Sequence, residues 1–223
     1  MELIKEIKYF AKILQNKQPK IFCIGKNKTG TTTLLKTMQM HGIRTGNQVR
    51  AELLADDYAA GNFKKIIRYC RSAQAFQDAP FSFPDTYKHL DQAFPNSKFI
   101  LTVRDSDTQW YNSLVKFHTK KFSSTNQAPT KSDLQRATYR EPGFAWKVNR
   151  ILHDTPEDDL YNEKLLKTSY NKHNTEVKAH FKNNDKLLII NVSRAEDYER
   201  LCTFLHFKPL MKTFPWENKT SQI

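Results

Sequence analysis

The sequence is poor in glycine and cysteine, and each shortage excludes a class of protein. Its 223 residues include 6 glycines and no low-complexity tract, which excludes collagen-like and glycine-rich chains. The three cysteines are far apart and form no C-x-x-C pair, so we expect neither a disulfide framework nor a cysteine zinc site. Three reduced thiols, as in a cytosolic protein, are the expected state of Cys23, Cys70 and Cys202.

Long hydrophobic runs are also missing. No segment approaches the roughly 20 apolar residues of a membrane span. Residues 1–20 carry a Lys or Glu every few positions and lack the apolar run of a signal peptide. We therefore expect a soluble, cytoplasmic protein with no membrane span. Apolar residues at helical spacing over 3–14 predict an amphipathic N-terminal helix, which Pro19 ends.

Apolar content and positive charge are what the chain does have. Hydrophobic residues make up 39% of the sequence and aromatic residues 12%, enough for a core, so a wholly disordered chain is excluded. The 36 Lys and Arg outnumber the 23 Asp and Glu and give a formal net charge of +13. This charge favours an anionic partner such as nucleic acid, an acidic membrane surface, a phosphorylated cofactor or an acidic glycan, although it can also serve solubility alone.

Short apolar runs alternate with segments of helical periodicity. This order indicates βαβ units and a three-layer α/β/α fold, in which helices cover both faces of a central parallel sheet. At this length we expect one domain over residues 1–223. The predicted strands are 20–25, 73–80, 97–105 and 186–193. The predicted helices are 31–42, 50–71 as one or two helices, 83–95, 107–122, 143–153, 160–182 and 195–206, with a loop over 123–132.

Ligands of open parallel sheets bind at the carboxyl ends of the strands. The first predicted strand is followed there by "GKNKTGTTT", which opens a helix. Gly25 and Gly30 have the G-x-x-x-x-G spacing of a Walker A loop. Because the N–H groups at the start of a helix attract anions, we predict an anion-binding loop at residues 25–30, called the 25–30 loop below.

The position of a lysine separates this loop from a Walker A loop. A Walker A loop has Lys directly after its second glycine, followed by Ser or Thr for magnesium. Here Thr31 follows Gly30, and a lysine lies two positions before Gly30, at Lys28. A nucleotide triphosphatase would lack its phosphate lysine, and no magnesium is expected.

Two motifs together resemble those of sulfotransferases. The string "GKNKTGTTTL" resembles the phosphosulfate loop of that family, and "FPNSKFILTVRDSDTQWYNSL" resembles the strand and helix that bind the 3′-phosphate. Softer similarities in "YNKHN", "LLIINVS" and "FPWENK" extend the resemblance over residues 20–219. The resemblance implies the P-loop NTPase-like fold and the sulfuryl donor 3′-phosphoadenosine-5′-phosphosulfate (PAPS), with no metal.

The resemblance also implies roles for individual residues. Lys28 would neutralise the leaving group, and adenosine 3′,5′-bisphosphate (PAP) would be the product. Arg104 and Ser113, with Lys219 from the tail, would bind the 3′-phosphate. The family spacing from Arg to Ser is usually one residue shorter, so Asn112 is the alternative to Ser113. The 5′-phosphate would be held by Thr29, Gly30, Thr31, Thr32 and Thr33.

A general base should remove the proton of the acceptor. The string "FQDAP" resembles the segment in which cytosolic sulfotransferases carry a catalytic His two residues before a Pro, and Asp78 stands there. Burial can raise the pKa of an aspartate from its reference value near 4 towards neutrality. We take Asp78 as the base and His118 as the reserve, with a turn-forming role before Pro80 as the alternative for Asp78. His173 is expected to pack with Tyr170 on a helix.

The acceptor, a small molecule or a glycan, is expected against the helical region 106–182. The cofactor-binding core would be 20–105, the N-terminal helix 1–18, and 186–223 would hold the last strand, helix and tail. A basic and aromatic cluster in the helical region can receive an acidic sugar or an aromatic alcohol, or can form a solvated helix end. Its members are Lys116, Phe117, Lys120, Lys121 and Phe122.

Three other functions stay open. A small-molecule or nucleotide kinase of the same fold would need ATP and magnesium, and the displaced lysine argues against it. A basic nucleic-acid-binding module would follow from the charge, but no helix-turn-helix, ribonucleoprotein or zinc-finger signature supports it, so no nucleic acid partner is expected. The third is a related domain that binds the nucleotide without turnover, because Asp78 replaces the histidine.

Overall fold

Four parallel strands form the centre of the molecule. In this computed structural model, which describes residues 19–215, the strands lie in the order β2-β1-β3-β4. Phe22 of β1 is aligned with Phe76 of β2 and with Phe99 of β3, and every pairing is parallel. The sheet confirms the predicted α/β class, while the helix predicted for 3–14 lies outside the described residues. The strands are β1 (Ile21–Cys23), β2 (Ala75–Phe76), β3 (Lys98–Thr102) and β4 (Leu187–Ile190).

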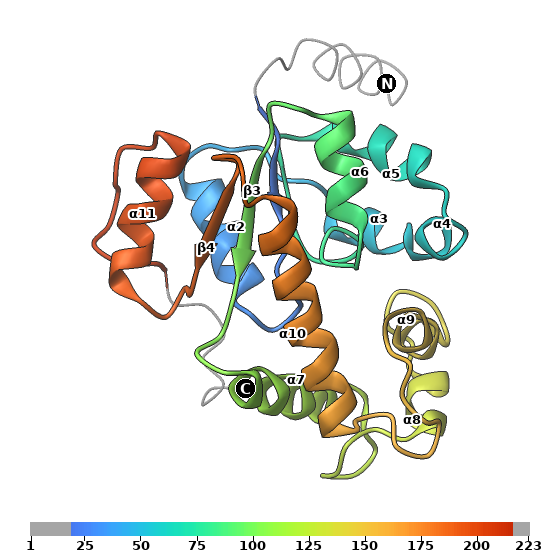
Figure 1. Ribbon diagram of the computed structural model, residues 1–223. Helices are drawn as coiled ribbons and strands as arrows, with labels where there is room; N and C mark the ends of the chain where they lie inside the picture. The colour runs from blue at the N-terminus through green and yellow to red at the C-terminus, as the bar shows by residue number, and fades with distance from the viewer. Residues whose placement is uncertain (1–18, 216–223) are drawn as a thin grey trace, which may run out of the picture.

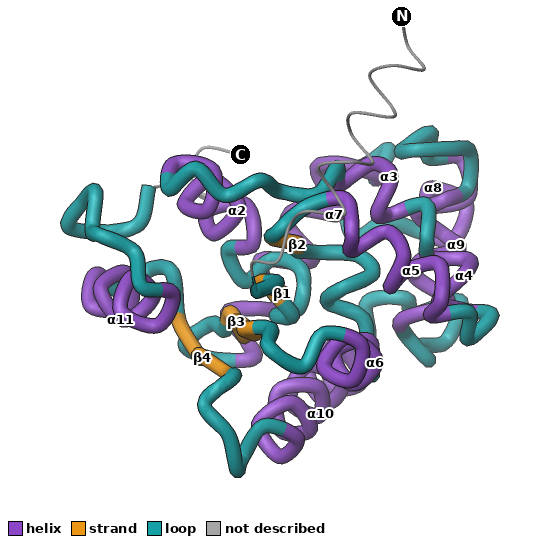
Figure 2. Tube along the Cα trace, turned by 90° about the horizontal axis from the view of Figure 1, so that it is seen from above, coloured by secondary structure: helices purple, strands orange, loops and turns teal. Residues whose placement is uncertain are grey.

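Helices cover both faces of the sheet, which gives the three predicted layers (Figure 1, Figure 2). Side chains alternate along each strand, so Phe22 and Phe99 face one apolar cluster while Cys23 and Ile100 face the other. The Cys23 side packs against α2 (Thr31–Met40) and α11 (Ala195–Leu205). The Phe22 side packs against α3 (Gln48–Glu52), α5 (Phe63–Tyr69), α6 (Thr86–Ala93) and α10 (Glu163–His180).

Further helices lie beyond the carboxyl ends of the strands (Figure 1). Trp110 of α7 stacks on Tyr170 of α10, with ring centroids 4.6 Å apart. Ala55 of α4 and Phe144 of α9 share an apolar cluster, which joins this helical part to the segment after β1. These helices are α7 (Asp107–Phe122), α8 (Lys131–Arg136) and α9 (Phe144–Leu152). The remaining elements, α4 (Ala55–Ala59) and the 3-10 turn η1 (Cys70–Ser72), belong to the segment between β1 and β2.

One prediction of local structure was wrong, and another extended past the true end of its segment. The segment 50–71 contains short helices that start at residue 48, and Gly61, with φ of 69°, separates the last two. The predicted loop over 123–132 ends in α8, where Thr130 and Asp133 form a capping box. Turn chemistry therefore outweighed the apolar periodicity and the polar composition on which these two predictions rested.

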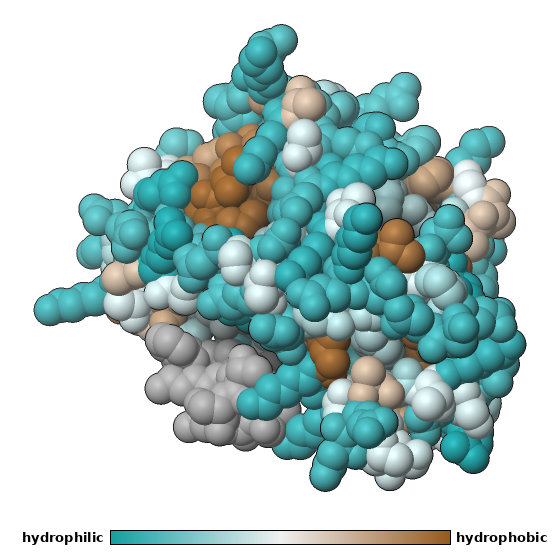
Figure 3. Space-filling view, turned by 60° about the horizontal axis from the view of Figure 1, so that its bottom comes forward, coloured by the Kyte–Doolittle hydropathy of each residue, from teal (hydrophilic) through white to brown (hydrophobic). Residues whose placement is uncertain are grey.

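The surface is hydrophilic, as the many charged residues of the sequence predict. Viewed from the side of α7, it is mostly hydrophilic, with separate hydrophobic patches (Figure 3). None of the helices between residues 19 and 215 is both long and apolar enough to cross a membrane. Cys23, Cys70 and Cys202 are buried and free of disulfide bonds, as predicted.

The 25–30 loop begins against the end of β3. A Cβ atom on Gly25 would lie 2.2 Å from the Oγ1 of Thr102 and 2.4 Å from its carbonyl oxygen. Real Cβ atoms essentially never approach another atom within 3.0 Å. The path of the chain from β1 into the loop therefore requires glycine at this position.

Gly25→Ala should lower the free energy of unfolding by about 3 kcal/mol, because the backbone of the loop or of β3 has to move. Gly42→Ala is the control, since no atom lies within 4 Å of a Cβ there. Its φ of 73° leaves only left-handed strain, about 1 kcal/mol. Denaturant unfolding followed by circular dichroism measures both losses, and equal losses would contradict the close contact.

Candidate functional site

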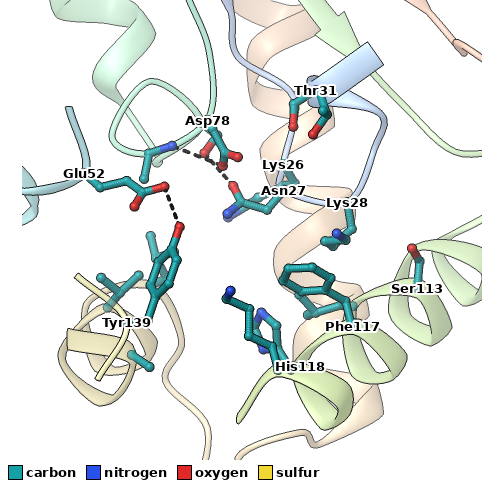
Figure 4. Close-up of a pocket in the computed structure, with 18 of the residues that line it drawn as sticks. Lys26, Asn27, Lys28, Thr31, Glu52, Asp78, Ser113, Phe117, His118 and Tyr139 are labelled. Carbon is teal, nitrogen blue, oxygen red and sulfur yellow. Dashed lines mark hydrogen bonds between the residues drawn. The ribbon is translucent and has the colours of Figure 1, made fainter. Parts of the chain in front are cut away.

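A cavity of about 470 Å³ lies at the carboxyl ends of β1 and β3. The 25–30 loop and the start of α2 form one wall, the segment after β2 forms another, and α7 and α9 lie opposite (Figure 4). Its size suits a small-molecule site. Lys219 lies outside the described residues. The cavity brings together these predicted site residues: Lys28, Gly30, Thr31, Thr32, Thr33, Asp78, Arg104, Ser113 and His118.

The start of α2 has the properties of an anion site. Gly30 precedes the helix with φ of 99°, and no side chain caps the helix there. The first turn carries no acidic residue and brings Thr31, Thr32 and Thr33 to the cavity wall. The positive end of the helix dipole and the N–H groups that no side chain caps favour a negatively charged group at this point.

Thr29 is placed differently from the other threonines. Its side chain is fully buried, and its hydroxyl donates to the Lys26 carbonyl at 2.6 Å. The same hydroxyl accepts a hydrogen bond from the Thr102 hydroxyl at 2.6 Å. Because the hydroxyl is already engaged, contact between Thr29 and a ligand has to come through its backbone N–H.

Two residues that follow β3 hold the loop in place. The Nε of Arg104 donates to the Lys28 carbonyl at 2.8 Å. The indole Nε1 of Trp110 donates to the Asn27 carbonyl at 2.9 Å. On the other side, the Ser82 hydroxyl donates to the side-chain oxygen of Asn27 at 2.9 Å. The conformation of the loop is therefore set by the segments around it.

Lys28 combines an unusual backbone with a partly buried charge. Its φ of 71° lies in the left-handed region, which non-glycine residues rarely adopt. Its Nζ lies 3.3 Å from the ring centroid of Phe117, a cation–π contact. Burial lowers the pKa of Lys28 to about 8, although the carboxylate of Asp78 opposes the shift. The ammonium keeps most of its charge at neutral pH and faces the cavity.

Asp78 faces the same space and has a raised pKa (Figure 4). Its φ is 62°, and its carboxylate accepts a hydrogen bond from the Ala79 N–H at 3.1 Å. Burial and the negative charge of Glu52 raise the pKa of Asp78 to about 6, while Lys28 opposes the rise. The carboxylate is ionised at pH 7 and is a stronger proton acceptor than an ordinary aspartate.

Glu52, which the sequence analysis missed, connects the core to the helical part. Its side chain is 8% exposed and accepts hydrogen bonds from the Tyr139 hydroxyl at 3.1 Å and the Gln48 amide at 3.2 Å. It also pairs with the guanidinium of Arg140, whose φ is 65°. Glu52 and Tyr139 are 87 residues apart, so no local motif could have indicated this group.

His118 also lines the cavity, as the reserve base should. Its Nδ1 forms a hydrogen bond with the Tyr161 hydroxyl at 2.9 Å. Burial and the positive charge of Lys28 lower the pKa of His118 to about 3. The imidazole is neutral and is a much weaker proton acceptor than the carboxylate of Asp78.

His173 is not among the residues that line the cavity. It lies on α10 together with Tyr170, as expected, and its Nε2 donates to the Ile24 carbonyl at 2.8 Å, just before the 25–30 loop. Its ring is edge-on to Tyr87, with centroids 6.2 Å apart. His173 therefore links α10 to the end of β1.

Arg104 and Ser113 both reach the cavity wall. Ser113 is 9% exposed, whereas the alternative, Asn112, is exposed on the outer side of α7, which favours Ser113. Within residues 19–215 no carboxylate lies within ion-pair distance of the Arg104 guanidinium. Asp105 pairs with Arg194 at 2.7 Å instead. The guanidinium of Arg104 thus keeps hydrogen-bonding capacity for an anion.

The basic and aromatic cluster of α7 is divided between the cavity and the outside. Lys120 faces a shallow outer depression, while the Nζ of Lys121 lies 4.7 Å from the ring centroid of Tyr139. The remaining members make one wall of the cavity both aromatic and basic. The members on the cavity wall are Lys116, Phe117, Lys121 and Phe122.

The family of the chain follows from comparison with known proteins. A family model described as a sulfotransferase domain matches residues 20–223, which include the 25–30 loop and the β3–α7 unit. No curated protein matches the chain in sequence. Within residues 19–215, no three or more His, Cys, Asp or Glu side chains are grouped so that they could hold a metal ion.

Glu52→Gln should bring the pKa of Asp78 clearly below 6, because it removes a negative charge and leaves Arg140 without its acidic partner. Carbon-detected NMR titration measures this pKa, with the signal assigned through Asp78→Asn. The control is Glu141→Gln, because Glu141 pairs with Lys147 at 2.7 Å on the surface. An unchanged titration in Glu52→Gln would contradict the interaction.

Proposed function

Because this chain belongs to the sulfotransferase-domain family, we propose that it moves a sulfuryl group from PAPS to a hydroxyl or amine of a small-molecule or glycan acceptor. The observation that carries the proposal is the meeting of Lys28 and Asp78 in one cavity beside the uncapped start of α2. A cation, a base and an anion site are the three parts that sulfuryl transfer requires.

The residues of the donor side fit an anionic nucleotide. The backbone N–H groups of Thr29 and Gly30 and the threonines at the start of α2 would hold the 5′-phosphate. Arg104 would bind the 3′-phosphate, because a guanidinium matches phosphate geometry in a bidentate manner, and Ser113 would add a hydroxyl. We assign Lys219 to the same phosphate on the family resemblance.

Lys28 stabilises the charge of the leaving group. PAPS supplies an activated sulfuryl group: the acceptor atom bonds to sulfur while the bond from sulfur to the 5′-phosphate oxygen breaks. Negative charge develops on that oxygen, and a fixed cation in a partly dry site stabilises it strongly. The ring of Phe117 holds the ammonium by a cation–π contact at 3.3 Å, so no carboxylate needs to be displaced from Lys28.

Asp78 accepts the proton of the acceptor. Its pKa of about 6 leaves it ionised at neutral pH and more basic than a solvent-exposed aspartate. The proton moves to the carboxylate, and the electron pair left on the acceptor atom forms the new bond to sulfur. His118, with a pKa of about 3, is less suited to this role.

Titration calorimetry with PAP and with ATP plus magnesium tests the proposal, followed by a transfer assay with PAPS and a panel of phenols and sugars. We expect PAP to bind at least about tenfold more tightly than ATP. A preference for ATP with magnesium would indicate a kinase. Binding of PAP without transfer to any acceptor would indicate an inactive nucleotide-binding domain, and salt-sensitive DNA binding without nucleotide binding would indicate a nucleic-acid module.

Lys28→Ala should lower kcat by about 10²–10³-fold, since it removes the charge that stabilises the leaving group. Lys36→Ala is the matched control, because Lys36 is exposed on the helix that follows the same loop. Steady-state kinetics with PAPS measures kcat, and circular dichroism verifies that both variants fold. Near-normal turnover of Lys28→Ala would remove Lys28 from the mechanism.

Arg104→Met should weaken PAP binding by about 10- to 100-fold and AMP binding much less, because AMP lacks the 3′-phosphate. Arg194→Met is the control, since Arg194 is an exposed arginine that pairs with Asp105 at 2.7 Å. Calorimetry with both nucleotides measures the losses. Equal losses for PAP and AMP would mean that Arg104 acts only by holding the Lys28 carbonyl.

A further inference from the structure

Lys26 is a buried cation that the proposed mechanism does not use. The residue is 4% exposed and lines the cavity, and its Nζ has no hydrogen-bond partner within residues 19–215. Lys20 shows the ordinary arrangement of a buried lysine. It is 7% exposed, and its Nζ donates to the Ala73 carbonyl at 2.6 Å.

An unpartnered ammonium at this depth is destabilising. Burial of a charge is costly unless an opposite charge or hydrogen bonds compensate for the lost water. Burial lowers the pKa of Lys26 to about 8, with the charge of Glu176 opposing the shift. Glu176 itself pairs with Lys172 at 3.8 Å. At neutral pH Lys26 remains largely charged, so the partner that the site lacks is an anion.

A second unpartnered group faces the same cavity. The Nδ1 of His153, just after α9, is buried and has no hydrogen-bond partner in the described part of the chain. Burial and the positive charge of Lys26 lower the pKa of His153 to about 3, so its ring is neutral. With the proton on Nδ1, this ring can donate to the same ligand oxygen or group of oxygens as Lys26.

Lys26 and Lys28 act on different parts of the cavity. Lys28 interacts with Asp78 and Arg104, which belong to the reaction centre. Lys26 interacts with the titratable groups of α10 and with His153 at the end of α9. His153 directly follows α9, and the groups of α10 that interact with the charge of Lys26 are Glu176 and His173. Both helices belong to the region 106–182, which is assigned to the acceptor.

We propose that Lys26 and His153 form a subsite for an anionic group on the acceptor, a carboxylate, a sulfate or a phosphate. The proposal rests on the proposed function in that it takes the ligand of this side to be the acceptor. The anion would receive charge-assisted hydrogen bonds from Lys26 and a hydrogen bond from His153. The subsite therefore favours an acidic acceptor over a neutral acceptor of the same shape, because the neutral acceptor would leave the Lys26 ammonium unpaired.

Two probes of matched shape test the subsite: 4-hydroxyphenylacetate, which carries a carboxylate, and its neutral amide, 4-hydroxyphenylacetamide. Titration calorimetry on the full chain without nucleotide measures their binding independently of sulfuryl transfer. We expect the carboxylate to bind at least about tenfold more tightly. Lys26→Met should abolish this preference, and Lys20→Met should retain it. No preference in the unmodified protein, or a preference that survives Lys26→Met, would overturn the proposal.

Proton uptake gives a second readout from the same titrations. At pH 8, close to the pKa of Lys26, a bound anion should cause uptake of up to about half a proton. Glu176, His173 and His153 also interact with Lys26, and the two histidines have pKa values of about 4 and about 3. Lys28 of the same loop has a pKa of about 8 as well, so the uptake that belongs to Lys26 is the part that Lys26→Met removes. Calorimetry in buffers of different ionisation enthalpy measures the uptake. Its absence in the unmodified protein, or an uptake that is equally large in Lys26→Met, would overturn the proposal.

Thermal unfolding without ligand separates a ligand subsite from a structural lysine. Lys20→Met breaks a buried hydrogen bond and should lower Tm by about 2–4 °C. Lys26→Met removes an unpaired charge and should leave Tm unchanged or raise it. A loss as large as that of Lys20→Met would mean that Lys26 has a partner in the folded protein, and would overturn the proposal. A failure of the proposed sulfuryl transfer would appear in the PAP titration instead, and would leave these measurements unaffected.

Discussion

The contact between the 25–30 loop and the end of β3 is the constraint on which the site depends. Gly25 lies so close to Thr102 that a Cβ has no room, and the hydroxyls of Thr29 and Thr102 are joined at 2.6 Å. Arg104 then holds the Lys28 carbonyl. These contacts join the loop after β1 to the end of β3. As a result, the start of α2, Lys28 and Arg104 all line one cavity.

Charge in this cavity is only partly compensated, and the proposed chemistry depends on this property. Lys28 rests on an aromatic ring instead of a carboxylate, and Asp78 lies near another acid instead of in a salt bridge. Among the described residues, five non-glycine residues have a left-handed backbone, and three of them, Lys28, Asp78 and Arg140, line the cavity. Strained backbone and perturbed pKa values are known to concentrate at functional sites.

Much of the fold and about half of the site could be predicted from local patterns. The parallel sheet follows from the apolar runs, and the anion site follows from the glycine spacing between β1 and α2. The proposal that Asp78 is the base came from resemblance. Glu52 and His153 were missed because nothing near them in the chain distinguishes them from ordinary polar residues. Lys26 lies within the predicted loop, but the sequence does not show that its ammonium is buried without a partner. The capping box of α8 was present in the sequence and was overlooked.

The sequence by itself determined the alternation of strands and helices and the junction of loop and helix, because apolar periodicity and glycine act over a few neighbouring residues. The tertiary structure alone decided which charges are buried, paired or left without a partner. A pKa depends on lost solvent and on the charges of groups brought close in space. In this protein those groups come from segments that lie far apart in the chain, as Glu52 and Asp78 or Lys26 and His153 do.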